Sequence, residues 1–157
     1  MRKLLNACQE PGQHRLVRLG VFAGLRIREI TQLIRENWMR ESRMLRLTGK
    51  NSKRREIPVH EELEPYLDEI FDMNPHSRQP GTSTSNLDRV GRGLQLRTDV
   101  SFKSHQLRKS FATNLGNHDV PYDVIQHLLG HAGDVTRKYF KKPPMHVLRD
   151  AIERIQY

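Results

Sequence analysis

Two short strand-like runs within an otherwise helical pattern constrain the fold of this chain more than any other feature. Residues 44–47 and 55–59 are such runs, and the turn-like segment Gly49 to Ser52 lies between them. This arrangement is typical of a β-hairpin. Because proline donates no hydrogen bond to a neighbouring strand, Pro58 favours an edge position for the second run. The chain is therefore expected to contain one small antiparallel sheet.

Apolar residues at helical spacing occupy most of the remaining chain. Pro121 and Gly130 are typical start and stop signals of one helix, and Ser104 is expected to cap another. Residues 72–85 have the most loop-like composition. The expected helical segments are 16–22, 25–34, 61–71, 86–96, 104–115, 121–129 and 147–155. The pattern predicts a mainly α domain with a small antiparallel β-sheet, which is an α+β fold.

Length and charge limit the possible classes of protein. A chain of 157 residues is expected to form a single domain over 1–157. Its 27 Lys and Arg against 18 Asp and Glu give a formal charge of +9, which favours a polyanionic partner. Cys8 is the single cysteine, so an internal disulfide and a cysteine-based zinc site are excluded. No run of apolar residues is long enough to span a membrane, and we expect a cytoplasmic protein.

Two segments suggest chemistry on a phosphate group. Residues 104–115 read S-H-Q-L-R-K-S-F-A-T-N-L, and residues 128–139 read L-L-G-H-A-G-D-V-T-R-K-Y. Guanidinium stays protonated and offers paired N–H donors that match phosphate oxygens, so Arg108 and Arg26 are candidates for a phosphate clamp. Two simpler readings stay open. Arg108 could be a neighbour of His105 on a solvated helix face, and Arg26 could extend its charge out of a semi-buried turn.

In their order and context these segments resemble the catalytic domain of the tyrosine recombinases, the phage integrase family. The resemblance covers nearly the whole chain, although the spacing from the L-G-H histidine to the tyrosine is one residue shorter than is usual in the family. The matching catalytic positions are Arg26 in A-G-L-R-I-R-E-I, Lys50 in the G-K turn, His105 and Arg108 in H-Q-L-R, His131 in L-L-G-H, and Tyr139.

The resemblance implies strand cleavage through a 3'-phosphotyrosine, with Tyr139 as the nucleophile. A tyrosine with an ordinary pKa near 10 needs a base or a strong positive field, and His105 is the candidate base. Lys50 is the candidate acid for the leaving 5'-oxygen. His131 would donate a hydrogen bond to the phosphate. No cofactor or metal is expected, because Leu128 follows His127 where a zinc hydrolase motif needs glutamate.

The expected partner is double-stranded DNA, bound by a homotetramer on paired sites that forms from monomers. The family's N-terminal helical domain has no counterpart in these 157 residues, and the helix at 145–157 either docks on its own domain or is exchanged between subunits. The encoding genome would be bacterial or archaeal, or that of a phage or mobile element. Alternatives are a type IB topoisomerase and a DNA-binding relative without catalysis. The candidate DNA contacts are Lys53, Arg54, Arg55, Lys103, Arg137 and Lys138.

Overall fold

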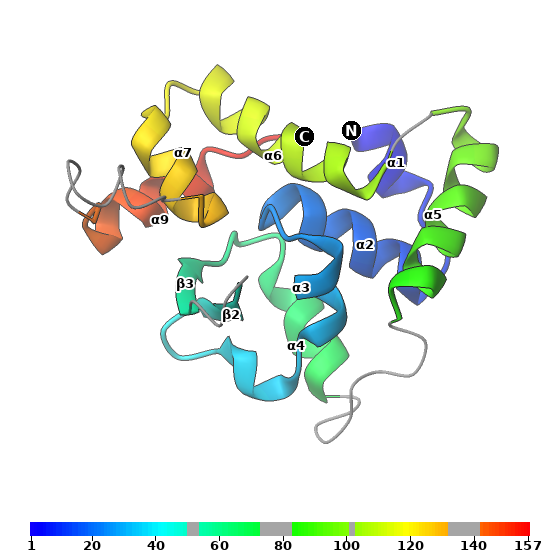
Figure 1. The fold of residues 1–157 in the computed structure, drawn as a ribbon, viewed down its shortest axis with the longest axis horizontal. Helices are drawn as coiled ribbons and strands as arrows, with labels where there is room; N and C mark the ends of the chain where they lie inside the picture. Colours follow the sequence, from blue (N-terminus) through cyan, green and yellow to red (C-terminus); the bar gives the residue numbers. More distant parts are fainter. Residues whose placement is uncertain (50–53, 73–82, 101–102, 132–141) are drawn as a thin grey trace.

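The computed structural model confirms a mainly helical domain with a small antiparallel sheet (Figure 1). It describes residues 1–49, 54–72, 83–100, 103–131 and 142–157. The helices are α1 (Arg2–Asn6), α2 (Pro11–Phe22), α3 (Ile27–Gln32), η1 (Arg35–Asn37), α4 (Glu64–Asp72), α5 (Thr84–Thr98), α6 (Ser104–Asn117), α7 (Tyr122–Leu129) and α9 (Met145–Glu153). The strands are β1 (Trp38–Met39), β2 (Met44–Thr48) and β3 (Arg54–Pro58).

The predicted hairpin is part of a three-stranded sheet in the order β1-β2-β3. Strand β3 lies at its edge, as Pro58 predicted, while the short strand β1 was not predicted. Leu45 pairs with Ile57, and both side chains are fully buried. Because directly opposed residues share a face of an antiparallel sheet, this pair defines the face that packs on the helices.

Helix α2 is the centre of the helical part and packs against α3, α5 and α6. Two glycines permit these contacts. A Cβ atom on Gly20 would lie 2.7 Å from the Cβ atom of Leu107 in α6, so only glycine allows this approach. Gly24 has a φ of +60°, and a Cβ atom there would lie 2.6 Å from the ring of Phe111. The close packing of α2 on α6 therefore depends on both positions.

Several predicted boundaries differ from the structure. Helix α5 begins at Thr84 instead of residue 86, because the side chain of Ser83 accepts a hydrogen bond from the backbone N–H of Asn86. Helix α6 begins at Ser104 itself, so the predicted capping role of Ser104 is wrong and Lys103 is the cap residue. Among the helices that the structure describes, none is both long and apolar enough to cross a membrane.

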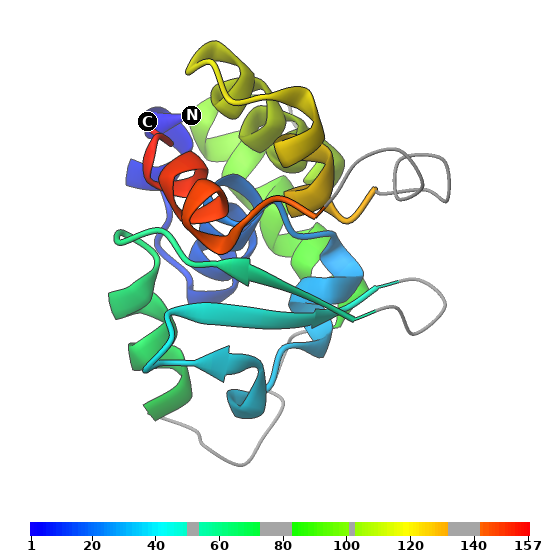
Figure 2. The same cartoon turned by 90° about the vertical axis from the view of Figure 1, so that its left-hand side faces the viewer.

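Helix α9 packs on its own domain, against α7 and β3 (Figure 2). It buries Leu148 and Ile152, and the segment after it is held by side-chain hydrogen bonds. His60 Nε2 lies 3.1 Å from the carbonyl oxygen of Ile155, and the hydroxyl of Tyr157 donates to the carbonyl of Val21 (3.2 Å). The two chain ends lie side by side. Exchange of this helix between subunits stays a prediction.

Candidate active site

Arg26 occupies the N-cap position of α3, two residues after Gly24, which has a positive φ. Its backbone N–H donates to Glu29 Oε2 (2.8 Å), and its Nη1 lies 3.3 Å from Glu29 Oε1. The Arg26 side chain is nevertheless 40% exposed, whereas that of Glu29 is 4% exposed. Arg26 is thus anchored at its backbone and retains guanidinium donors that can reach a ligand.

Glu29 connects three arginines and was not identified from the sequence. Its carboxylate accepts two hydrogen bonds from Arg55, at 2.6 and 3.2 Å, and lies 3.8 Å from Arg108 Nη1. Burial acts to raise the pKa of Glu29, but the hydrogen bonds and charge of Arg55, the backbone N–H of Arg26 and the charge of Arg108 outweigh it, so the pKa lies below its ordinary value. The signal in the sequence was a carboxylate three residues after Arg26, within an apolar helical frame.

Arg108 is buried, which excludes the solvated-face reading of this residue. Its Nη1 donates to the carbonyl oxygen of Gly24, and its Nη2 donates to the carbonyl oxygen of Leu129. Burial and the nearby charge of Arg26 lower the pKa of Arg108 to about 10, so it stays protonated at neutral pH. Two backbone carbonyls therefore fix a permanent positive charge inside the site.

His131 follows the left-handed turn at Gly130 that ends α7, and its Nε2 lies 3.1 Å from Arg108 Nη2. Since an arginine can only donate, Nε2 is the acceptor and the proton of a neutral imidazole lies on Nδ1. Burial, followed by the charges of Arg108, Arg26, Arg55 and His105, lowers the pKa of His131. His131 therefore presents a neutral N–H donor beside the arginines.

His105 is exposed and lies one turn before Arg108 in α6. Its charge contributes to the lowered pKa of His131, so the two imidazoles share one electrostatic environment. The structure thus brings four of the six predicted catalytic residues into one neighbourhood. The remaining two, Lys50 and Tyr139, lie outside the described residues.

The predicted DNA contacts divide into three groups. Arg54 and Lys103 are exposed, and Lys53, Arg137 and Lys138 lie in the segments that the structure does not describe. Arg55 differs from Arg54, because its side chain is 12% exposed and its guanidinium is bound to Glu29.

The structure describes the other three tyrosines, Tyr66, Tyr122 and Tyr157. Burial raises the pKa of Tyr66 and of Tyr157, which makes both phenols hard to ionise. Tyr122 is 76% exposed at the start of α7, at the opposite end of this helix from His131. In the described part of the chain, none of the three contacts Arg26 or Arg108, and Tyr139 stays the predicted nucleophile.

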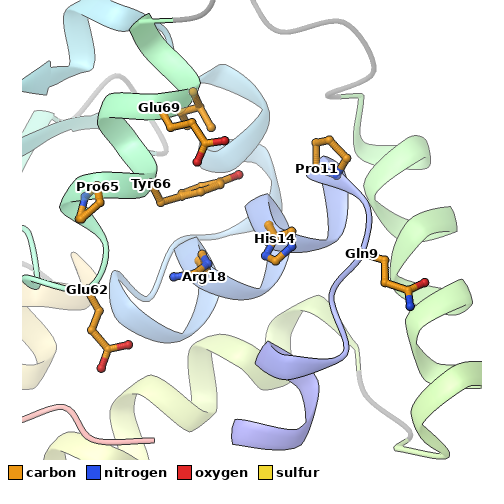
Figure 3. A pocket seen from close by; sticks show the side chains of 9 residues that line it. Gln9, Pro11, His14, Arg18, Glu62, Pro65, Tyr66 and Glu69 are labelled. Atoms are coloured by element: carbon orange, nitrogen blue, oxygen red, sulfur yellow. The ribbon is translucent and has the colours of Figure 1, made fainter.

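A separate pocket of about 360 Å³ lies between α2 and α4 (Figure 3). Arg18 lies 5.8 Å above the ring of Tyr66 within it, a cation–π contact. Both acidic and basic side chains surround the pocket, so its lining does not select a polyanion. Its lining residues are Gln9, Pro11, His14, Arg18, Glu62, Pro65, Tyr66, Glu69 and Ile70.

The arginine cluster, by contrast, has the charge that a phosphodiester requires. Three guanidinium groups and one carboxylate leave two net positive charges among Arg26, Glu29, Arg55 and Arg108. A phosphodiester carries one negative charge and gains a second as an anionic nucleophile attacks it. Preorganised donors with this charge stabilise the transition state more than the ground state.

Comparison with known proteins places the chain among relatives. The sequence model of the phage integrase family matches residues 1–143. Tyrosine recombinase XerA of Pyrococcus horikoshii is 31% identical over 144 residues, which cover 84% of this chain and 50% of that protein. Tyrosine recombinase XerD of Pasteurella multocida is 28% identical over 149 residues, with 84% and 49% covered.

A solved structure shows the same fold. The integrase from mycobacterium phage Brujita superposes with a TM-score of 0.80 at 22% identity, covering 99% of this chain and 55% of that one. The chain spans about half the length of the curated relatives it matches. The family match extends over every residue of the arginine cluster, and on this evidence the chain belongs to the phage integrase family.

Proposed function

We propose that this chain is the catalytic domain of a site-specific recombinase that cleaves and rejoins DNA strands without a metal. The observation that carries the proposal is the cluster of Arg26, Arg55 and Arg108 around the buried carboxylate of Glu29, which has two net positive charges and His131 beside Arg108. The relatives named tyrosine recombinases support the same reaction class. Tyr139 would attack the phosphorus, form a 3'-phosphotyrosine and release a 5'-hydroxyl.

The geometry suggests a division of roles within the site. Arg26, with an exposed guanidinium, contacts the non-bridging oxygens directly. Arg108, held by two backbone carbonyls, contributes its positive charge to the site and fixes the tautomer of His131. His131 then donates from Nδ1 to the phosphate. His105 accepts the proton of Tyr139, and Lys50 protonates the leaving oxygen.

The substrate in this proposal is double-stranded DNA, to which the formal charge of +9 attracts the domain. Monomers would assemble as a tetramer on two paired sites, because strand exchange needs one active site for each strand. The protein would act in the cytoplasm of a bacterial or archaeal host. The energy of the cleaved bond is kept in the phosphotyrosine, so rejoining needs no ATP.

A trapping experiment tests the nucleophile. The substrate is a pool of nicked duplexes with randomised sequence. After cleavage the short strand beyond the nick diffuses away, so the cut strand cannot be rejoined and the covalent adduct is seen on a denaturing gel. Tyr139→Phe is expected to abolish the adduct and leave DNA binding nearly intact, since only the hydroxyl is removed. EDTA is expected to have no effect.

The matched control is Tyr122→Phe, at an exposed tyrosine outside the arginine cluster, which is expected to form the adduct as the wild type does. An adduct that persists in Tyr139→Phe would refute the assignment of the nucleophile. Loss of the adduct on chelation would refute a metal-free reaction. Recombinant rather than relaxed circular products distinguish a recombinase from a topoisomerase.

A further inference from the structure

Arg55 faces the interior because of its register in the sheet. It pairs with Leu47 of β2, next to the pair of Leu45 and Ile57 two residues along. Residues two apart in a strand share a face, so Arg55 lies on the buried face of the sheet. The neighbouring pair, Arg46 and Glu56, lies on the opposite face and forms an exposed ion pair (3.0 Å).

On this buried face Arg55 occupies both oxygens of Glu29. Its Nη1 donates to Oε1 at 2.6 Å and its Nη2 to Oε2 at 3.2 Å, a two-pronged contact that arginine forms with carboxylates. Arg26 and Arg108 lie farther from the same carboxylate, at 3.3 and 3.8 Å. Arg55 is thus the closest partner of Glu29 among the three guanidinium groups.

Arg55 also supports the turn that carries His131. A Cβ atom on Gly130 would lie 2.9 Å from Arg55 Cδ and 3.0 Å from its Nη1, so the turn rests directly on the guanidinium. The preceding carbonyl, that of Leu129, accepts from Arg108. Arg55 and Arg108 therefore hold the same turn at consecutive residues.

We propose that Arg55 is a positioning residue that keeps Glu29 occupied, so that the donors of Arg26 and the charge of Arg108 remain available to the phosphate of DNA. Without Arg55, Glu29 would be a buried carboxylate lacking its main partner, and such a charge recruits the nearest cation. The nearest cations are Arg26 and Arg108, the two arginines of the phosphate clamp. Arg55 would then act on the reaction without touching the substrate, a role that rests on the proposed function.

A double-mutant cycle of Arg55→Ala and Glu29→Gln tests this idea. With saturating nicked duplex, Arg55→Ala is expected to slow single-turnover adduct formation by about 100-fold, because small displacements of a clamp have effects of this order. Glu29→Gln alone is expected to slow the reaction too, since Arg26 and Arg55 lose their anchor. In the Arg55→Ala background, however, Glu29→Gln is expected to accelerate it, because the carboxylate that captures the clamp is gone.

The opposite sign of the Glu29→Gln effect in the two backgrounds is the decisive result. A general electrostatic effect would have the same sign in both, and that outcome would overturn the proposal. Arg55→Lys is expected to restore part of the rate, because lysine supplies the charge without the paired donors. A salt dependence of DNA binding that falls by about one unit in Arg55→Ala, with an unchanged rate at saturation, would make Arg55 a DNA contact instead.

The matched control is the cycle of Arg46→Ala and Glu56→Gln, the exposed ion pair of the same sheet, where no coupling is expected. A readout without cleavage keeps the proposed function separate. Inorganic phosphate, titrated by the chemical shifts of the His131 ring, is expected to bind more weakly to Arg55→Ala and to recover with Glu29→Gln. If the wild type forms no adduct but this cycle shows the recovery, the recombinase proposal fails while the role of Arg55 stands. Absence of the recovery overturns that role.

Discussion

At the scale of single residues, the site holds several like charges close together, and Glu29 and a neutral His131 make this possible. Arg108 has a lowered pKa, of about 10, because burial and neighbouring cations act on it. A protonated His131 beside it would add one more positive charge. The hydrogen bond from Arg108 to His131 Nε2 is compatible only with the neutral ring. A neutral His131 is thus needed for the contact with Arg108 and limits the positive charge of the site.

We therefore predict that His131 titrates below the ordinary imidazole pKa of about 6.5. As the pH falls through that value, the unfolded chain takes up the proton before the folded one does. The free energy of unfolding should then decrease between pH 6.5 and the lowered pKa of the folded state. Urea unfolding of the wild type and of His131→Gln across this range measures the difference.

Burial and the charge of Arg18 also lower the pKa of His14, so His14 contributes to the same loss of stability. Because His14 is present in both proteins, the difference between the wild type and His131→Gln reports His131 alone. The wild type should lose more stability on acidification than the variant. Ring titration by NMR gives the same answer independently. A His131 that titrates at or above the ordinary value would contradict the assigned tautomer and the contact with Arg108.

At the scale of elements, the contact between α2 and α6 places Arg108. Gly20→Ala would bring a methyl group within 2.7 Å of Leu107 Cβ, next to Arg108, so α6 must move. We predict a loss of stability of about 1–3 kcal/mol, typical of overpacking, together with slower adduct formation. The control is Gly116→Ala, in the helix α6 that carries Arg108. The added methyl group meets nothing within 4 Å and should raise stability by about 0.4–1 kcal/mol. Equal stabilities of the two variants would show that this contact does not position α6.

Sequence patterns predicted these elements better than their contacts. The hairpin, its edge strand and the helices around Gly24 are local, so spacing and turn residues identify them. Arg55 shows the limit of such reasoning. Its neighbours Lys53 and Arg54 suggested a basic surface run, and only pairing with Leu47 shows that it faces inward. Glu29 was missed for the same reason, because its partners Arg55 and Arg108 lie far from it in the sequence.

At the scale of the whole molecule, the site exists only where the helical part and the sheet meet. Arg26 comes from α3, Arg55 from β3, Arg108 from α6, and His131 follows α7 (Figure 1). The site therefore requires the complete tertiary fold, including the packing of helix α9. Helix α9 packs on α7 and β3, the two elements that carry Arg55 and lead to His131.

This packing predicts that α9 supports its own domain before any assembly on DNA. Ile152 is fully buried, so Ile152→Ala should lower the free energy of unfolding by about 2–5 kcal/mol. Leu96, at 88% exposure in α5, provides the control, because Leu96→Ala removes an apolar side chain already in water and should change stability by less than about 0.5 kcal/mol.

Urea unfolding at several protein concentrations distinguishes the two arrangements of α9. Docking within one chain gives a loss that is independent of concentration, whereas a helix exchanged between free subunits would make the loss vary with concentration. A concentration-independent loss would still allow α9 to be exchanged after DNA brings the subunits together, and that exchange would then have to break the contacts of Ile152 first.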